Sequence, residues 1–130
     1  MIGRRKGSGS LTQMELQFMN VLWDQRKCSV QQMQDALAQA GTELAYTTVQ
    51  TVLNTLEKKG KATRTLDGRA YLYLPAITKE SILKQAVREL AEKMFGGSSE
   101  DLVMSLIETR EVDAGRIAKL AKKMSEEKTK

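Results

Sequence analysis

The chain contains 130 residues, of which 41% are hydrophobic and 28% are charged, and its formal net charge is +5. This length suits one small domain, or a domain with an oligomerising tail, and excludes a large catalytic scaffold. With no histidine and one cysteine, the chain cannot form a Ser-His-Asp triad, a Cys-His pair, an internal disulfide or most zinc sites. We therefore expect no enzyme, no cofactor and no bound metal.

Residues 1–10 combine three basic side chains with a Gly/Ser stretch and are predicted to form a flexible basic arm. No apolar run follows these charges, so we expect no secretory signal. Apolar runs elsewhere are far shorter than the roughly 20 residues that a membrane-spanning helix needs. The sequence therefore predicts a cytoplasmic protein without membrane insertion.

The first predicted helix starts with Thr12 as N-cap and runs to about Gln25. Thr12 and Glu15 have the spacing of a capping box, which satisfies free backbone N–H groups at a helix start. Helical spacing then predicts one apolar face, formed by Leu16, Met19, Leu22 and Trp23.

A second capping box, Ser29 and Gln32, predicts another helix, which Gly41 ends. The apolar face of this short helix consists of Val30, Met33 and Leu37. Cys28, just ahead of it, is interpreted as a small semi-buried apolar residue rather than a redox thiol, because a lone thiol has no partner for such chemistry.

A third helix is predicted from about Tyr46 to Lys59, where the apolar spacing is sharpest. Its buried face consists of Val49, Val52, Leu53 and Leu56, and its opposite face is polar and free of carboxylates. Ala45 cannot cap the helix through its side chain, and Thr47 offers an alternative cap. The phase of this helix is therefore open by a residue or two.

Residues 61–74 are predicted to form two short strands joined by an Asp67-Gly68 turn and closed by Pro75. Three helices followed by a hairpin with a basic residue on each arm are typical of a winged helix-turn-helix, which we assign to residues 11–75. For Tyr71 and Tyr73 we favour packing on the helices over stacking on bases. The predicted fold class is mainly α with a small β-hairpin.

Residues 76–130 are predicted to form three amphipathic helices, from about residues 78, 98 and 113. Because roughly forty helical residues are too few for an independent core, these helices either pack on the first domain or pair with a second chain. We favour a homodimer, which makes residues 76–130 a helical dimerisation domain. The predicted dimerisation residues are Ile82, Val87, Leu90, Leu102, Val103, Leu106, Ile117 and Leu120.

The polar face of the third helix suits the major groove of DNA. Residues 1–75 hold ten Lys or Arg against six Asp or Glu, and Asn and Gln side chains can pair with adenine. The predicted DNA-binding residues are Tyr46, Thr47, Thr48, Gln50, Thr51, Asn54, Lys58, Arg64 and Arg69, with the basic ones, and Lys61, on phosphates. A solvated helix face, a protein-interaction module and a non-specific architectural DNA-binding protein remain the alternatives.

The chain resembles the penicillinase-repressor family (BlaI/MecI/CopY), which includes methicillin-resistance and copper-transport repressors. The matching residues are Leu11, Thr12, Glu15, Val21, Leu22 and Trp23 in the first helix; Tyr46, Thr47, Thr48, Val49, Thr51, Leu53, Asn54, Leu56, Lys58 and Gly60 in the third; Asp67, Gly68, Arg69, Ala70, Tyr71, Tyr73 and Pro75 in the hairpin; and Met94, Phe95, Gly96, Gly97, Ser98, Leu102 and Val103 in the tail.

The resemblance implies a homodimeric transcriptional repressor on a palindromic operator in double-stranded DNA. In the antibiotic-resistance branch, proteolysis in the tail inactivates the repressor downstream of a membrane-bound sensor, and Met94 and Phe95 align with the cleaved region. A protease or sensor pathway is therefore an expected partner. The copper branch carries a cysteine-rich C-terminal motif that this chain lacks, so copper sensing is not expected.

Overall fold

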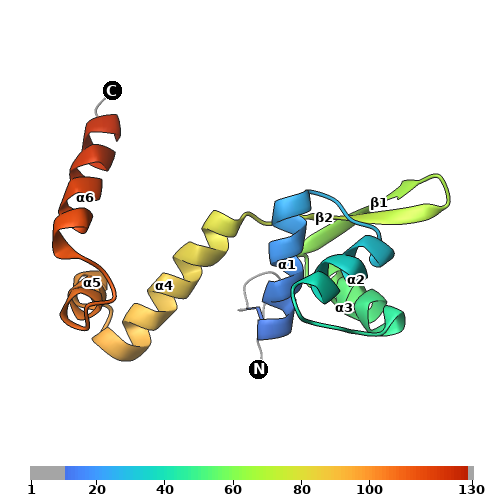
Figure 1. The fold of residues 1–130 in the computed structure, drawn as a ribbon, viewed down its shortest axis with the longest axis horizontal. Coiled ribbons are helices and arrows are strands. Elements are labelled where there is room, and N and C mark those ends of the chain that lie inside the picture. Colours follow the sequence, from blue (N-terminus) through green and yellow to red (C-terminus); the bar gives the residue numbers. More distant parts are fainter. Residues whose placement is uncertain (1–10, 129–130) are drawn as a thin grey trace. The chain divides into compact units, whose positions relative to one another are not determined.

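The computed structural model describes residues 11–128, which form six helices and one antiparallel hairpin (Figure 1). In chain order the elements are α1 (Gln13–Gln25), α2 (Val30–Gln39), α3 (Tyr46–Lys58), β1 (Ala62–Asp67), β2 (Ala70–Pro75), α4 (Lys79–Phe95), α5 (Ser99–Glu108) and α6 (Ala114–Lys128). The predicted fold class, mainly helical with a small hairpin, is confirmed. The predicted basic arm, residues 1–10, lies outside the described residues.

The chain forms two compact units that divide between Gln85 and Ala86, inside α4. The segment directly after the hairpin belongs to the first unit. Ile77 packs against the core of that unit, and its carbonyl oxygen accepts a hydrogen bond of 2.9 Å from the Trp23 indole N–H. The structural division therefore lies further along the chain than the Pro75 boundary expected for the DNA-binding domain.

The core of the first unit combines the inner faces of α1, α2 and α3 with residues next to and within the hairpin. Its members are Phe18, Met19, Leu22, Cys28, Val30, Met33, Leu37, Val49, Leu53, Leu56, Ala62 and Tyr73. The predicted apolar face of α1 is wrong at one end, because Leu16 is 39% exposed whereas Phe18 is fully buried. Phe18 and Leu22 are four residues apart, so they share a helix face that points into the core.

Both predicted capping boxes form. The Thr12 hydroxyl accepts from the Glu15 N–H at 3.0 Å, and the Glu15 carboxylate accepts from the Thr12 N–H at 3.0 Å. Ser29 and Gln32 make the same two bonds, at 3.0 and 2.9 Å. These local signals fix where α1 and α2 begin.

Helix α3 begins at Tyr46 with Ala45 at the N-cap position, and no side chain caps it. The alternative cap at Thr47 is therefore wrong, and the phase of the helix is settled. Val49, Leu53 and Leu56 are buried, which leaves Thr47, Thr51 and related positions on the outer side.

In the hairpin, Asp67 pairs with Ala70 as the last strand residues, so Gly68 and Arg69 form the loop. The predicted Asp67-Gly68 turn is wrong by one residue. Gly68 has a φ of 66°, and Arg69 is not among the residues with positive φ, as a type II′ turn with glycine in its first central position requires.

A short bridge extends this small sheet. Cys28 pairs with Tyr73, through backbone hydrogen bonds of 3.0 and 2.7 Å. The segment between α1 and α2 is thus tied to β2, an arrangement that the sequence analysis missed.

The second unit contains the end of α4 together with α5 and α6. The Ser98 hydroxyl caps α5 by accepting from the Asp101 N–H at 3.0 Å, and the Asp113 carboxylate accepts from the Arg116 N–H at 3.0 Å at the start of α6. Within residues 86–128, Ala91 is the one buried apolar residue. No helix among the described residues is long and apolar enough to cross a membrane.

Candidate nucleic-acid interface

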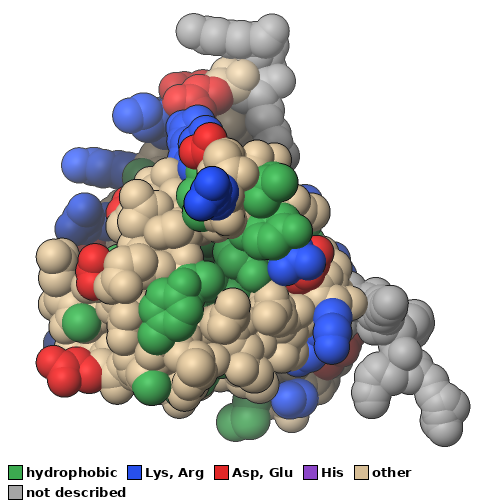
Figure 2. All heavy atoms as spheres, turned by 90° about the vertical axis from the view of Figure 1, so that its right-hand side faces the viewer, with side chains coloured by type: hydrophobic (Ala, Val, Ile, Leu, Met, Phe, Trp, Pro, Cys, Tyr) green, Lys and Arg blue, Asp and Glu red, His purple; other side chains and the backbone are tan. Residues whose placement is uncertain are grey.

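The outer face of α3 carries most of the predicted DNA-binding residues. Tyr46, Thr47, Thr48, Gln50, Thr51 and Lys58 are exposed, and Asn54 is half-buried. Because α3 is anchored by a buried stripe on its other side, this polar face is held outward. Figure 2 views the molecule from the hairpin side, where uncharged side chains and backbone cover much of the surface between Lys and Arg side chains.

The hairpin contributes two arginines in different settings. Arg69 lies exposed in the two-residue loop, at the end of the hairpin away from the helices. Arg64 lies on β1 with its guanidinium carbon 4.2 Å from the centroid of the Tyr71 ring, a cation–π contact. Its Nε atom is also 3.6 Å from a carboxylate oxygen of Glu57 on α3. Arg64 is therefore held against the hairpin and α3, whereas Arg69 projects from the turn.

Asn54 makes a long-range contact that the sequence analysis did not identify. The buried Tyr73 hydroxyl donates a hydrogen bond of 2.7 Å to Oδ1 of Asn54. Interaction with the Tyr73 side chain, with a smaller contribution from the charge of Glu57, raises the pKa of Arg64. The two tyrosines thus differ: Tyr73 packs as expected, whereas Tyr71 stays 44% exposed under Arg64.

Lys61 does not fit its predicted role as a phosphate contact, because the residue is only 2% exposed. Burial and the neighbouring charge of Lys59 lower the pKa of Lys61, although Glu15 acts in the opposite direction. Its backbone carbonyl accepts from the Ala76 N–H at 2.8 Å. Lys61 therefore belongs to the junction between α3 and the hairpin rather than to the outer face.

An ion pair fixes the C-terminal end of α3 to the start of α1. Lys59 Nζ is 2.7 Å from Glu15 Oε2, and the Glu15 side chain is buried while that of Lys59 is partly exposed. Burial alone would raise the pKa of Glu15, but the hydrogen bonds from Lys59 and Thr12 and the charge of Lys59 together lower it. Glu15 thus serves both the capping box and the placement of α3.

Cys28 is fully buried, and burial raises the pKa of its thiol to about 11. Its Sγ donates a hydrogen bond of 3.3 Å to the Gln25 side-chain oxygen. A thiol with this pKa is protonated at neutral pH, which agrees with an apolar packing role.

The predicted dimerisation residues are not buried within a single chain. Val87, Leu90, Val103, Leu106 and Leu120 are exposed, and Ile82, Leu102 and Ile117 are half-buried. At the predicted cleavage point, Met94 is exposed and Phe95 is half-buried. Gly96 and Gly97, with φ values of 59° and 91°, end α4 directly after it.

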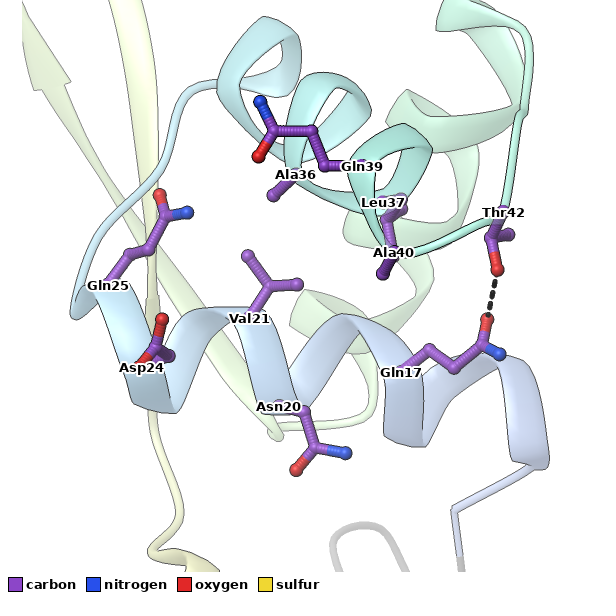
Figure 3. Close-up of a pocket in the computed structure, with 10 residues that line it drawn as sticks. All are labelled: Gln17, Asn20, Val21, Asp24, Gln25, Ala36, Leu37, Gln39, Ala40 and Thr42. Atoms are coloured by element: carbon purple, nitrogen blue, oxygen red, sulfur yellow. Dashed lines mark hydrogen bonds between the residues drawn. The ribbon is translucent and has the colours of Figure 1, made fainter.

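A groove of about 540 Å³ lies between α1 and α2 (Figure 3). Gln17, Asn20 and Asp24 line it from α1, and Gln39 lines it from α2. The Thr42 hydroxyl is 3.5 Å from the Gln17 side-chain oxygen at one end. Of the ten lining residues, four are amides, four are apolar, one is a carboxylate and none is basic, so we place the nucleic-acid interface on α3 and the hairpin instead.

Three packed helices, a two-stranded wing and an outward polar face on the third helix define a winged helix-turn-helix protein. Residues 11–126 match the family model described as penicillinase repressor. The chain therefore belongs to the penicillinase-repressor family, and the resemblance inferred from its residues is confirmed.

Individual relatives support the same assignment. The chain is 23% identical over 116 residues to the penicillinase repressor of Bacillus licheniformis, covering 89% of this chain and 90% of that protein. It is 34% identical over 100 residues to the transcriptional regulator BlaI of Mycobacterium tuberculosis, covering 75% and 72%. The solution structure of the DNA binding domain of the repressor BlaI aligns with a TM-score of 0.50 and 28% identity, covering 58% of this chain and 90% of that domain.

Proposed function

We propose that this protein is a homodimeric transcriptional repressor that binds a palindromic operator in double-stranded DNA. The observation that carries the proposal is the outward face of α3, which is polar, mostly exposed and without an acidic residue from Tyr46 to Leu56, beside an arginine-bearing hairpin. A helix of this kind fits the major groove of B-DNA, which is about 12 Å wide. The similar solved domain is a DNA binding domain of a repressor.

In this proposal the side chains divide into two roles. The uncharged side chains of α3 read base edges, while basic ones neutralise phosphates and fix the register of the protein on the duplex. The base-reading set is Tyr46, Thr47, Thr48, Gln50, Thr51 and Asn54, and the phosphate set is Lys58, Arg64 and Arg69. The protein acts by binding, without catalysis, in the cytoplasm where a bacterial operator lies.

Residues 76–130 pair two chains. Support comes from the exposed apolar side chains of α4, α5 and α6, which a second copy would cover. Pairing also increases the difference in binding free energy between the operator and other sequences. One helix reads few base pairs, and each mismatch costs only about 1–3 kcal/mol. Two copies related by a two-fold axis multiply that discrimination, with half-sites about 10 base pairs apart.

Cleavage next to Met94 and Phe95 relieves repression, downstream of a protease or membrane-bound sensor. The two glycines that follow end α4 and lack stabilising side chains, and local opening is least costly at such a junction. Cutting there removes α5 and α6 from the chain and returns each DNA-binding unit to weaker monomeric binding. Immunoblots of induced cells test this step, and a chain that stays full length during induction would contradict it.

Selection from a pool of random duplexes tests the DNA-binding proposal. The full chain should enrich one sequence with two inverted half-sites at physiological salt. Enrichment without sequence preference would indicate architectural binding, and no enrichment would indicate a protein-interaction module. Either result would overturn the proposal.

A further inference from the structure

The strongest unexplained feature of the interface is a hydrogen bond that links the hairpin to α3, next to an arginine of the hairpin. Arg64 and Tyr73 are direct partners across the two strands, and the interaction of their side chains raises the pKa of Arg64. The Tyr73 hydroxyl donates a hydrogen bond of 2.7 Å to Oδ1 of Asn54 on α3. Tyr73 is 2% exposed, so packing in the core fixes the position of its side chain.

The direction of this bond follows from the chemistry of the groups. A phenol has one O–H donor, and of the two amide atoms of Asn54 only the oxygen is an acceptor. Because Oδ1 is the atom bonded to the Tyr73 hydroxyl, the hydroxyl donates and the amide oxygen accepts. This bond fixes the orientation of the Asn54 amide. Its oxygen is bonded to Tyr73, and its nitrogen is left to donate to another partner.

We propose that Tyr73 is a positioning residue that presents the amide nitrogen of Asn54 to the DNA, and that the base read there is guanine. This inference rests on the proposed function. In the major groove guanine offers two adjacent acceptors, O6 and N7, whereas adenine offers one acceptor and one amino donor. An amide that is free to use both its atoms pairs with adenine, but here the oxygen is already held by Tyr73.

The test compares the full chain with two variants on the selected operator, with each of the four base pairs placed at every half-site position. Dissociation constants come from fluorescence anisotropy, and thermal unfolding of each variant serves as the folding control. The wild-type chain should prefer guanine over adenine by about tenfold at one position per half-site. Tyr73→Phe removes the hydroxyl and frees the amide, so this preference should disappear at that position and persist at the others.

Asn54→Asp is the matched second variant. A carboxylate still accepts from the Tyr73 hydroxyl but offers no donor, so the preferred base at the same position should change to cytosine, whose amino group donates. This variant keeps the test decisive if Tyr73→Phe does not fold.

Three results would overturn the inference. The first is a wild-type preference for adenine or thymine at the position that Asn54→Asp alters. The second is an unchanged guanine preference in Tyr73→Phe. The third is a uniform loss of affinity in both variants without a change of preferred base, which would assign the hydrogen bonds a purely structural role. Failure of the proposed function looks different, because the wild-type chain would then prefer no sequence at all.

Discussion

Glu15 shows how one side chain can serve two purposes. One carboxylate oxygen completes the capping box with the Thr12 N–H at 3.0 Å, and the other binds Lys59 at 2.7 Å. The residue therefore connects the first turn of α1 to the end of α3. Since α3 carries the proposed reading face, a local capping signal also positions the interface.

Glu15→Gln should reveal this second role through pH. Glutamine keeps the capping box but loses the charged bond to Lys59, so we expect a loss of about 1–2 kcal/mol in the free energy of unfolding at pH 7. The folded protein lowers the pKa of Glu15 below its usual 4.5, so the carboxylate stabilises the fold above that pH and loses this effect as the pH falls.

Urea unfolding at several pH values between 7 and 3 measures both proteins. The difference in stability between wild type and Glu15→Gln should be constant near neutral pH and should narrow below pH 4.5, the usual carboxyl value. A difference that stays the same down to pH 3 would show that the ion pair contributes nothing.

Arg69→Ala tests the phosphate role of the hairpin turn. Because phosphates carry no sequence information, the variant should bind all duplexes less tightly by a similar factor. Because a dimer loses two such contacts, the slope of log affinity against log salt should fall by about two. Arg88→Ala, which removes the same charge from an exposed position on α4, is the control and should leave both properties unchanged. Loss of sequence preference in Arg69→Ala would assign it a base contact instead.

At the scale of elements, local signals predicted most of the fold. The two capping boxes, the apolar stripe of α3 and the order of helices and hairpin depend on residues close together in the chain, and these predictions are confirmed. The predictions were wrong where two nearby residues fit the same local pattern equally well. Leu16 and Phe18 are both apolar, and only the packing of α1 on the other helices buries Phe18.

The contacts that define the interface could not be predicted in this way. Asn54 and Tyr73 are 19 residues apart, and Glu15 and Lys59 are 44 apart. Such pairs depend on how α1, α3 and the hairpin pack together, which no spacing rule encodes. The sequence therefore predicted which residues face outward on α3, but not that one of them, Asn54, accepts a hydrogen bond from Tyr73 of the hairpin.

The N-terminus of helix α3 lacks a side-chain cap, and a substitution can supply one. Ala45 provides no side-chain cap, so Ala45→Ser should stabilise the protein by about 0.5–2 kcal/mol, because a hydroxyl can accept from a free backbone N–H. Thermal unfolding measures the effect, and Ala45→Gly is the control for backbone changes. An unchanged or lowered melting temperature in Ala45→Ser would mean that these N–H groups are already satisfied by water.

At the scale of the whole molecule, the two units differ in how they bury apolar surface. The first has a core of twelve buried residues, whereas Leu90, Leu106 and Leu120 in the second are exposed. An exposed apolar set of this kind is typical of an oligomer interface. The second unit is thus the part of the chain that needs a partner.

The double variant Leu90→Asp, Leu106→Asp should shift the protein from dimer to monomer. Buried carboxylates are strongly unfavourable at an apolar interface, whereas the first unit retains its own core. Sedimentation velocity at micromolar concentration measures the change. Leu16→Asp, at an exposed position of α1, is the control and should stay dimeric. A wild-type chain that sediments as a monomer would refute the proposed pairing.

The spacing of the two half-sites tests the two-fold reading of DNA most directly. Inserting about five base pairs between the half-sites rotates one of them by half a helical turn, so a dimer can no longer reach both from one face. The affinity of the full chain should then fall by about a hundredfold or more, because the second contact is lost. Equal affinity for the original and the lengthened operator would contradict the account.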